Sequence, residues 1–334
     1  MTRKRPTIYD VAQAAGVSKS LVSLVLQNSP RVSEESRAAV QAAIVDLGYR
    51  RSQAAADLAA GRTRVVGVLI DDYTNLWFVD MVRGLHAALG PAGYRLSVVD
   101  VASDSQVADP IDSFLAMRVD GMVVGMDPPR ALIGQDLPPV VVVGTREVPV
   151  GAPRAFDSVA NDDAEGGQLV ARHLVELGHR RLGHLSVGGG AARARREAFT
   201  AQALSLGASV VGTGWAGRAT DATGYDGAWE LLGAHPEITG IFAANDVMAV
   251  GALAAARDRG RSVPDDLSIV GYDDTSLAAA RLVGLTTVDD LSHSVGREAG
   301  RLLLDRMRGS AAEPSHVILS PALTVRSTTA PAGR

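Results

Sequence analysis

Apolar residues recur at helical spacing near the amino terminus and in short continuous runs over the rest of the chain. In the first fifty residues the apolar positions fall three or four apart, which predicts helices. Thr7, Ser18 and Ser33 can cap three such helices, and Gly16 and Gly48 supply the positive φ that ends a helix. The pattern therefore predicts an amino-terminal module of three short helices.

From Val65 onward, β-branched runs alternate with amphipathic stretches. The expected strands are Val65–Ile70, Arg95–Val101, Gly121–Gly125, Val140–Gly144, Arg181–Val187, Ser209–Gly212, Ile241–Ala244 and Leu267–Gly271. The expected helices include Phe78–Leu89, Asp163–Leu177, Arg195–Leu206, Tyr225–Leu232 and Met248–Arg259. Continuous apolar strands separated by helices specify parallel sheets covered on both faces. Eight or more strands predict an α/β body of two doubly wound parallel sheets.

A polar, alanine-rich stretch joins the two patterns and contains one large apolar residue, Leu58. We therefore expect three parts: a helical domain over residues 1–49, a hinge over residues 50–64, and an α/β body of two subdomains over residues 65–334. A chain of 334 residues is long enough for such a division.

The segment from Thr7 to Gln27 has the order of a helix-turn-helix: a short helix, a glycine turn and a second capped helix. Lys19, Ser20 and Ser23 point away from the apolar seam of the second helix, as does Gln27. This geometry places a second helix in the major groove of DNA. An ordinary helical hairpin is the alternative for this segment taken alone.

Charge is unevenly divided between the parts. The chain has a net charge of −4, yet residues 1–64 hold ten Lys or Arg and five Asp or Glu. The remaining residues hold 23 basic and 32 acidic side chains. A basic module on an acidic body is typical of a protein that binds duplex DNA through the module alone.

Other classes of protein fit less well. The chain has no cysteine, which excludes disulfides and thiolate metal sites. It has no long apolar run and no leader pattern, so we expect a cytoplasmic protein with no membrane contact. Paired acids lie on separate strand ends, without a nucleophile elbow, a phosphate loop or metal-spaced histidines, so we expect no enzyme and no cofactor.

Taken together, these segments resemble the LacI/GalR family of bacterial transcription regulators. The markers include Thr7–Leu26, Leu47-Gly48-Tyr49, His179-Arg180-Arg181, Ala244-Asn245-Asp246 and Val263–Asp274. The resemblance implies a homodimer on a palindromic operator and a body like that of periplasmic sugar-binding proteins. It also implies a small effector between the two subdomains that changes DNA affinity, and repression as the common outcome.

The resemblance assigns roles in the helical domain. It places Lys19, Ser20 and Leu24 at the main base-contacting positions. Lysine can donate to guanine, whereas leucine offers apolar contact, for instance with a thymine methyl. Packing of Leu24 into the core of the domain is the alternative. Further DNA contacts are expected at Thr7, Ser18, Ser23 and Gln27. Of these, Ser18 and Ser23 are interpreted as caps and phosphate contacts, which position the helix and do not specify sequence.

Leu58 matches the family's hinge leucine, which enters the minor groove and kinks the duplex. The hinge departs from the family pattern, with Arg51, Ser52 and Ala56 in place of the usual residues and an acidic Asp57. Helix-favouring alanine offsets some of the lost contacts.

The resemblance also assigns the effector site, at the carboxyl ends of the strands where ligands of this fold class bind. The expected effector contacts are Asn75, Trp77, Phe78, Arg195, Asn245, Asp246 and Asp273. The alternative for Phe78 is the start of a core helix. Glycine at Gly125 and Gly144 indicates either a roomier pocket or a bulkier ligand that approaches the backbone.

Carboxylates facing hydroxyl donors suit a sugar, which we expect as the effector. A purine, a nucleoside or a phosphorylated metabolite is the alternative effector. A solute-binding protein is an alternative function, but it would leave the helical domain without a role. The tail after Thr328 is too short for a tetramerising coiled coil, so we expect a dimer.

Overall fold

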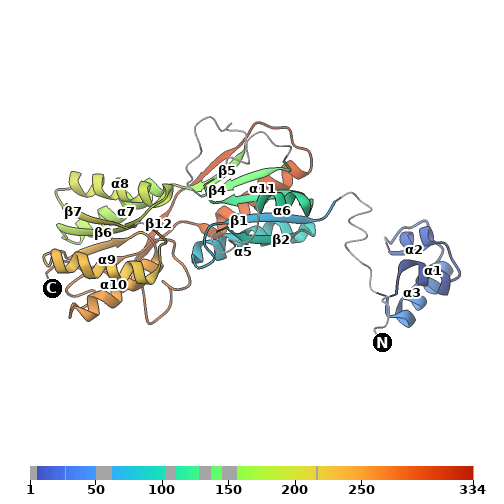
Figure 1. The fold of residues 1–334 in the computed structure, drawn as a ribbon, viewed down its shortest axis with the longest axis horizontal. Coiled ribbons are helices and arrows are strands. Elements are labelled where there is room, and N and C mark those ends of the chain that lie inside the picture. The colour runs from blue at the N-terminus through green and yellow to red at the C-terminus, as the bar shows by residue number, and fades with distance from the viewer. Residues whose placement is uncertain are drawn as a thin grey trace. The chain divides into compact units, whose positions relative to one another are not determined.

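The computed structural model describes residues 6–26, 28–49, 62–101, 110–127, 137–144, 156–215 and 217–333. The chain divides into two compact units, residues 1–63 and residues 64–334 (Figure 1). Within these described ranges, no helix has both the length and the apolar character needed to cross a bilayer.

The first unit holds three helices, α1 (Ile8–Ala14), α2 (Lys19–Leu26) and α3 (Glu34–Leu47). They surround a small core of Val11, Ala12, Val22, Val25, Val32, Val40 and Ala43. Ser33 caps α3 by accepting a hydrogen bond from the Ser36 backbone N–H, and Gly48 ends it in the left-handed conformation with φ +61°. The three predicted helices are confirmed.

The second unit contains a six-stranded parallel sheet in the order β11-β5-β4-β3-β1-β2. Its strands are β1 (Val65–Ile70), β2 (Arg95–Asp100), β3 (Gly121–Gly125), β4 (Val140–Val143), β5 (Asp157–Asn161) and β11 (His316–Leu319). Helices α5 (Leu76–Leu89) and α11 (Ser292–Met307) cover one face and share a core with it. Helix α6 (Pro110–Ala116) covers the other face. These elements form the first subdomain.

A four-stranded parallel sheet in the order β7-β6-β8-β9 forms the second subdomain. Its strands are β6 (Arg181–Val187), β7 (Ser209–Trp215), β8 (Gly240–Ala243) and β9 (Ser268–Val270). Its helices are α7 (Asp163–Glu176) and α8 (Gly190–Ser205) on one face and α9 (Asp221–Ala234) and α10 (Asp246–Asp258) on the other. The predicted α/β architecture with two parallel sheets is confirmed.

The chain crosses between the two subdomains three times. The crossings lie between β5 and α7, between β10 (Thr287–Asp289) and α11, and between β11 and β12 (Ala322–Thr324). Strands β10 and β12 pair with each other in antiparallel orientation beside these crossings. The sequence did not predict strands β5 and β11 or helix α11. Each of these elements lies next to a crossing between the subdomains.

Glycines let the helices that cover the sheets touch backbone to backbone. A Cβ atom at Gly84 of α5 would lie 2.0 Å from the His293 carbonyl oxygen of α11, and one at Gly296 would lie 1.9 Å from the Met81 carbonyl oxygen. Helices α9 and α10 meet in the same way, at Gly224 and Gly251. A side chain at any of these positions would force the helices apart.

The core of the second subdomain encloses a histidine. His184 of β6 is fully buried, with its ring 4.9 Å from that of Phe242 and 5.6 Å from that of Phe199. Neither ring nitrogen has a hydrogen-bond partner among the described residues. Burial, with a smaller contribution from Arg196, lowers the pKa of His184 to about 3. The buried imidazole is therefore neutral at physiological pH.

We predict that His184→Leu will flatten the dependence of stability on pH. The unfolded state binds a proton at His184 below its ordinary pKa of 6.5, while the folded state does not until about pH 3. Stability is therefore complete above pH 6.5 and falls as the pH falls, by about 2 kcal/mol between pH 6.5 and 5. Urea unfolding of both proteins across this range measures the difference. His173 and His179 also have lowered pKa values and act in the same direction in both proteins, so parallel curves would refute the assignment to His184.

Candidate functional site

The first helix of the amino-terminal unit begins at a complete capping box. The Thr7 hydroxyl accepts a hydrogen bond from the Asp10 backbone N–H at 3.4 Å, and the Asp10 carboxylate accepts one from the Thr7 backbone N–H at 2.7 Å. Gly16 in the turn has φ +65°. Ser18 accepts a hydrogen bond from the Leu21 backbone N–H at 3.2 Å, at the start of α2. The helix, turn and second helix predicted from the sequence are all present.

The outer face of α2 carries the residues proposed to contact bases. Lys19 and Ser20 are exposed. The Lys19 ammonium group donates a hydrogen bond to the Tyr9 hydroxyl at 3.3 Å and lies 5.0 Å from the centre of the Tyr9 ring. Tyr9 is itself exposed, so α1 and α2 present a joint surface of one cation and one aromatic hydroxyl. Such groups suit contact with phosphates and base edges.

Ser23 and Leu24 are half-buried. Leu24 packs against the core of the three-helix unit, as the inward alternative expected, while part of its surface stays accessible. Gln27 and Leu58 lie outside the described residues, so their predicted DNA contacts stay predictions.

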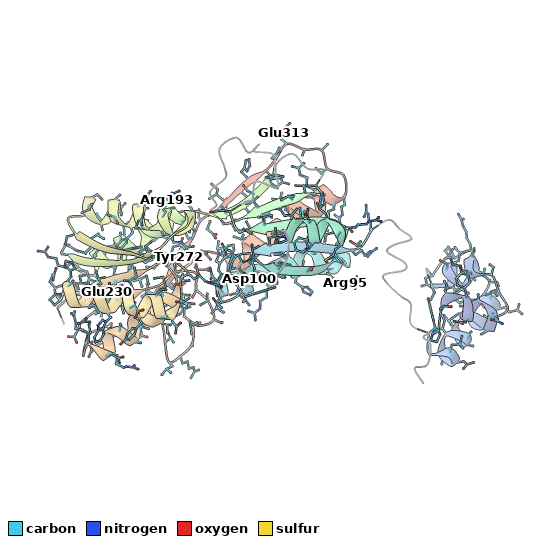
Figure 2. The ribbon with its side chains drawn as sticks, viewed as in Figure 1. Arg95, Asp100, Arg193, Glu230, Tyr272 and Glu313 are labelled. Carbon is cyan, nitrogen blue, oxygen red and sulfur yellow. The ribbon has the colours of Figure 1, made fainter. Side chains whose placement is uncertain are left out.

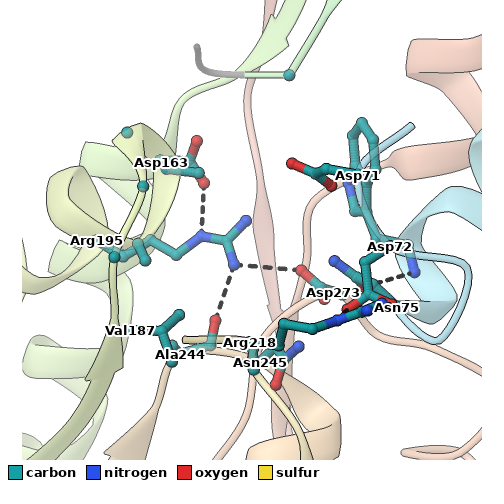
Figure 3. Close-up of a pocket in the computed structure, with 18 of the residues that line it drawn as sticks. Asp71, Asp72, Asn75, Asp163, Val187, Arg195, Arg218, Ala244, Asn245 and Asp273 are labelled. Carbon is teal, nitrogen blue, oxygen red and sulfur yellow. Dashed lines mark hydrogen bonds and ion pairs between the residues drawn. The ribbon is translucent and has the colours of Figure 1, made fainter. Parts of the chain in front are cut away.

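The two sheets of the second unit border a cavity of about 310 Å³ at the carboxyl ends of their strands (Figure 3). The lining residues used below come from the segments after β1, β3, β4 and β5 of the six-stranded sheet and after β6, β7, β8 and β9 of the four-stranded sheet. They are Asp71, Asp72, Asn75, Trp77, Phe78, Asp127, Gly144, Asp163, Arg195, Arg218, Asn245 and Asp273. The predicted position of the site, at the strand ends, agrees with this cavity.

Arg195 lies at the centre of a buried ionic cluster. Its Nε atom donates to Asp163 Oδ1 at 2.6 Å, and Nη1 donates to the Ala244 carbonyl at 2.8 Å and to Asp273 Oδ1 at 3.3 Å (Figure 3). Its guanidinium carbon is 3.6 Å from the centre of the Tyr272 ring. The neighbouring Arg193 is exposed and projects from the surface, whereas Tyr272 lies inside the subdomain (Figure 2).

A third carboxylate joins this cluster from the crossing before α11. Asp290 Oδ2 is 3.8 Å from Nη2 of Arg195 and accepts a hydrogen bond of 2.7 Å from the Trp77 indole N–H. Its other oxygen accepts from the Ser292 backbone N–H in the first turn of α11. Asp290 thus connects Arg195 to α5 and α11 of the first subdomain.

Acidic side chains outnumber basic ones in this cluster, and burial makes ionisation of the acidic side chains unfavourable. Burial raises the pKa of Asp273 well above its ordinary value, even though Arg195 acts to lower it. Burial likewise raises the pKa of Asp290 to about 8, against the opposing effect of Arg195. Burial acts to lower the pKa of Arg195, but Asp163 and Asp273 outweigh it and the pKa is raised. Arg195 is therefore always charged, and Asp273 and Asp290 hold their protons to a higher pH than free carboxyl groups do.

The structure places the remaining predicted effector residues in different surroundings. Asn75 lines the cavity and caps α5 by accepting from the Trp77 backbone N–H, and Asn245 lines it and caps α10 by accepting from the Met248 backbone N–H. Asp246 is not a lining residue. It is fully buried and its carboxylate accepts hydrogen bonds from the hydroxyls of Thr275 and Thr287. Asp246 is therefore a structural residue of the second subdomain.

Trp77 and Phe78 line the cavity but are mostly buried, with 5% and 3% of their surfaces exposed. The Phe78 ring packs in the core of the first subdomain and fills the space beside Gly125, where a Cβ atom would lie 2.9 Å from it. The expectation that Gly125 widens the pocket is thus wrong, because Phe78 occupies the room. Gly144 lines the cavity with φ +78°.

One pair of cavity residues was missed from the sequence. Asp72, after β1, forms an ion pair with Arg218, which follows β7 in the other subdomain (Figure 3). One contact of this pair, from Arg218 Nε to Asp72 Oδ2, is 3.0 Å. The two residues are 146 positions apart, and no spacing in the sequence indicates that they meet.

Comparison with known proteins supplies two family matches. Residues 7–52 match a model described as bacterial regulatory proteins, lacI family, and residues 171–329 match a periplasmic binding protein-like domain. The transcriptional regulator CelR of Thermobifida fusca is 32% identical over 97% of this chain and 98% of its own length. The transcriptional repressor PurR of Yersinia pestis is 31% identical over 96% of each chain.

Solved structures are also similar to this chain over most of its length. A LacI-family regulatory protein from Corynebacterium glutamicum is 45% identical over 81% of this chain and all of its own, with a TM-score of 0.73. The lac repressor dimer bound to operator is 26% identical over 98% of this chain and all of its own, with a TM-score of 0.83. A CelR–cellobiose complex is 29% identical over 97% of this chain and all of its own, with a TM-score of 0.68.

Proposed function

The chain belongs to the LacI family of bacterial transcriptional regulators, and from this premise we propose that it is a repressor that binds a palindromic operator as a homodimer and is controlled by a sugar. In this proposal residues 1–49 bind DNA, residues 50–64 form the hinge, and residues 65–334 bind the effector and form the dimer. The observation that carries the proposal is the pairing of a helix-turn-helix with a cavity between two parallel sheets in one chain.

The exposed face of α2 supports the DNA-binding role. Lys19 and Ser20 are exposed on α2, the helix that enters the major groove in this proposal, and residues 1–64 carry an excess of five basic side chains. Among regulators of this family the function is transcriptional control and not catalysis.

The charges of the cavity support an uncharged, hydroxylated effector. Five carboxylates line it, from Asp71, Asp72, Asp127, Asp163 and Asp273, against the two guanidinium groups of Arg195 and Arg218. Both arginines already pair with carboxylates of the site. A phosphate or carboxylate ligand would add negative charge to this excess, whereas sugar hydroxyls can donate to the carboxylates.

A purine or nucleoside is the second candidate effector. It is favoured by the likeness to PurR, a transcriptional repressor of similar length. Cellobiose is bound by the related CelR in its solved complex, and it is the first sugar to test.

Selection of bound duplexes from a random DNA pool tests the repressor assignment. The full-length protein at physiological salt should enrich a pseudo-palindrome with a central step that bends easily. An isolated half-site, or no enrichment, would contradict a dimer with a working hinge. Light scattering of the same sample should give the mass of a dimer, and a tetrameric mass would contradict that part of the proposal.

We predict that Leu58→Ala will weaken operator binding at least tenfold at fixed salt. An apolar side chain inserted at a base step stabilises the kinked duplex, and alanine is too short to do so. Fluorescence anisotropy with the selected duplex measures the dissociation constant. A dissociation constant equal to that of the wild type would exclude this role for Leu58.

We predict that Asp273→Asn will abolish the effector response and leave operator binding within about twofold of wild type. The substitution replaces a carboxyl group that lines the cavity by an amide and keeps the size of the side chain. Cellobiose, ribose and a set of nucleobases are first screened by thermal shift, and the ligand that stabilises the wild type is titrated into both proteins. If Asp273→Asn binds that ligand as tightly as the wild type, the cavity is not the effector site.

A further inference from the structure

The Asp72–Arg218 ion pair joins the two subdomains across the cavity. Asp72 follows β1 of the six-stranded sheet, and Arg218 follows β7 of the four-stranded sheet. Neither residue lies in one of the three crossings that already connect the subdomains. Both line the cavity, so the pair is part of the wall that a ligand meets (Figure 3).

Asp72 is held ready for this contact by its own loop. Its Oδ1 atom accepts a hydrogen bond of 2.7 Å from the Thr74 backbone N–H and a further one from the Thr74 hydroxyl. Burial alone would raise the pKa of Asp72, but the hydrogen bonds from Arg218 and Thr74 hold it below its ordinary value. Asp72 is therefore ionised at neutral pH in its pair with Arg218.

Both Asp72 oxygens take part in the pair. Arg218 donates from Nε to one oxygen and from Nη2 to the other, which is the two-pronged geometry that favours arginine. The Arg218 side chain keeps 43% of its surface exposed, while that of Asp72 keeps 12%. The ion pair therefore has a defined geometry, while its Arg218 side stays accessible to water. This exposure allows the pair to form and break.

We propose that the Asp72–Arg218 pair is a strap that holds the cleft closed while it is empty, so that opening of the cleft requires this pair to separate. The two partners move apart when the sheets separate, because each is fixed to a strand end of a different sheet. An ion pair with one exposed partner shifts an opening equilibrium by about two- to fivefold. The strap therefore shifts the opening equilibrium towards the closed cleft without preventing opening, and it weakens at high ionic strength.

The absence of cysteine from the chain gives a direct test. Cysteines introduced at Met117 and Leu204, exposed residues of the first and second subdomains, accept spin labels at these two places only. Pulsed electron paramagnetic resonance then measures the distance across the cleft in the full chain without DNA or ligand. Labelled protein is diluted with an excess of unlabelled protein so that each distance lies within one protomer.

We expect Arg218→Gln and Asp72→Asn each to raise the long-distance population about two- to fivefold, and the double variant to add nothing further. Arg218→Lys should lie between the wild type and Arg218→Gln. Arg257→Gln is the matched control, because Arg257 is an exposed arginine of the same subdomain that pairs with Asp258 on its own helix.

Two results would overturn the strap. One is a distance distribution that is the same in the wild type and in all variants of Asp72 and Arg218. The other is a double variant whose effect equals the sum of the single effects, because independent contributions exclude a pair. Since no operator or effector is present in the experiment, its outcome is separate from that of the repressor proposal.

Discussion

Replacing Arg195 by methionine is expected to lower the free energy of unfolding by about 3–5 kcal/mol at pH 8. Asp163, Asp273 and Asp290 would then lie buried around an apolar side chain, with no cation to offset their charge. Removing one partner of a buried ion pair costs more than the pair itself contributes, because the remaining charge cannot reach water. Urea unfolding of the full chain measures the loss, and the same variant should fail to bind the effector.

The loss should shrink as the pH falls. Carboxyl groups with a raised pKa in the folded state keep their protons at pH values where the unfolded chain has lost them, so stability rises as the pH is lowered. At pH 5.5 the penalty of Arg195→Met should be clearly smaller than at pH 8. Arg193→Met, on the exposed neighbour, should change stability by less than about 0.5 kcal/mol. A small penalty that does not change with pH would show that Arg195 does not balance these carboxyl groups.

A methyl group placed at Gly296 should lower the free energy of unfolding almost as much as the replacement of Arg195 does. The new Cβ atom of Gly296→Ala would lie 1.9 Å from the Met81 carbonyl oxygen, closer than any real contact, and that oxygen belongs to the backbone of α5. The two helices must separate, which opens the core they share and costs about 3 kcal/mol. Thermal or urea unfolding of the full chain measures this change.

Gly212→Ala is the control for this substitution. A Cβ atom at Gly212 would lie 3.8 Å from its nearest neighbour, which is ordinary contact, so the free energy of unfolding should stay within about 0.5 kcal/mol of wild type. If Gly296→Ala were as stable as Gly212→Ala, helices α5 and α11 would have to be free to shift, and backbone contact would not determine their spacing.

The predictable parts of the fold are those encoded by local pattern. The helix cap at Thr7, the glycine turn at Gly16 and the apolar run Val65–Ile70 depend on neighbouring residues, and the structure has them where expected. The position of the cavity also followed from local pattern, because parallel strands end at one edge of a sheet. Arg195 could be distinguished from Arg193 only through the family resemblance, and it is the buried one.

The missed parts depend on residues that are distant in sequence. Trp77 meets Asp290 across 213 positions, and Arg218 meets Asp72 across 146. The acid pair at Asp289 and Asp290 is visible in the sequence, but polarity alone does not tell which carboxylate turns inward. For Asp246, a strand-end position suggested a ligand contact, yet Thr275 and Thr287 from other segments occupy its oxygens.

The three crossings between subdomains also affect how the chain folds during synthesis. Helix α5 is complete at Leu89, but the helix that covers it, α11, ends at Met307, 218 positions later. Ribosomes add about 5–20 residues per second, so the apolar face around Met81 and Leu85 waits roughly 10–40 s for its partner. The second subdomain has most of its strands and helices before then. The first subdomain is therefore the first to be synthesised and the last to complete its core. Its exposed apolar face is where a nascent chain of this protein most needs protection from aggregation.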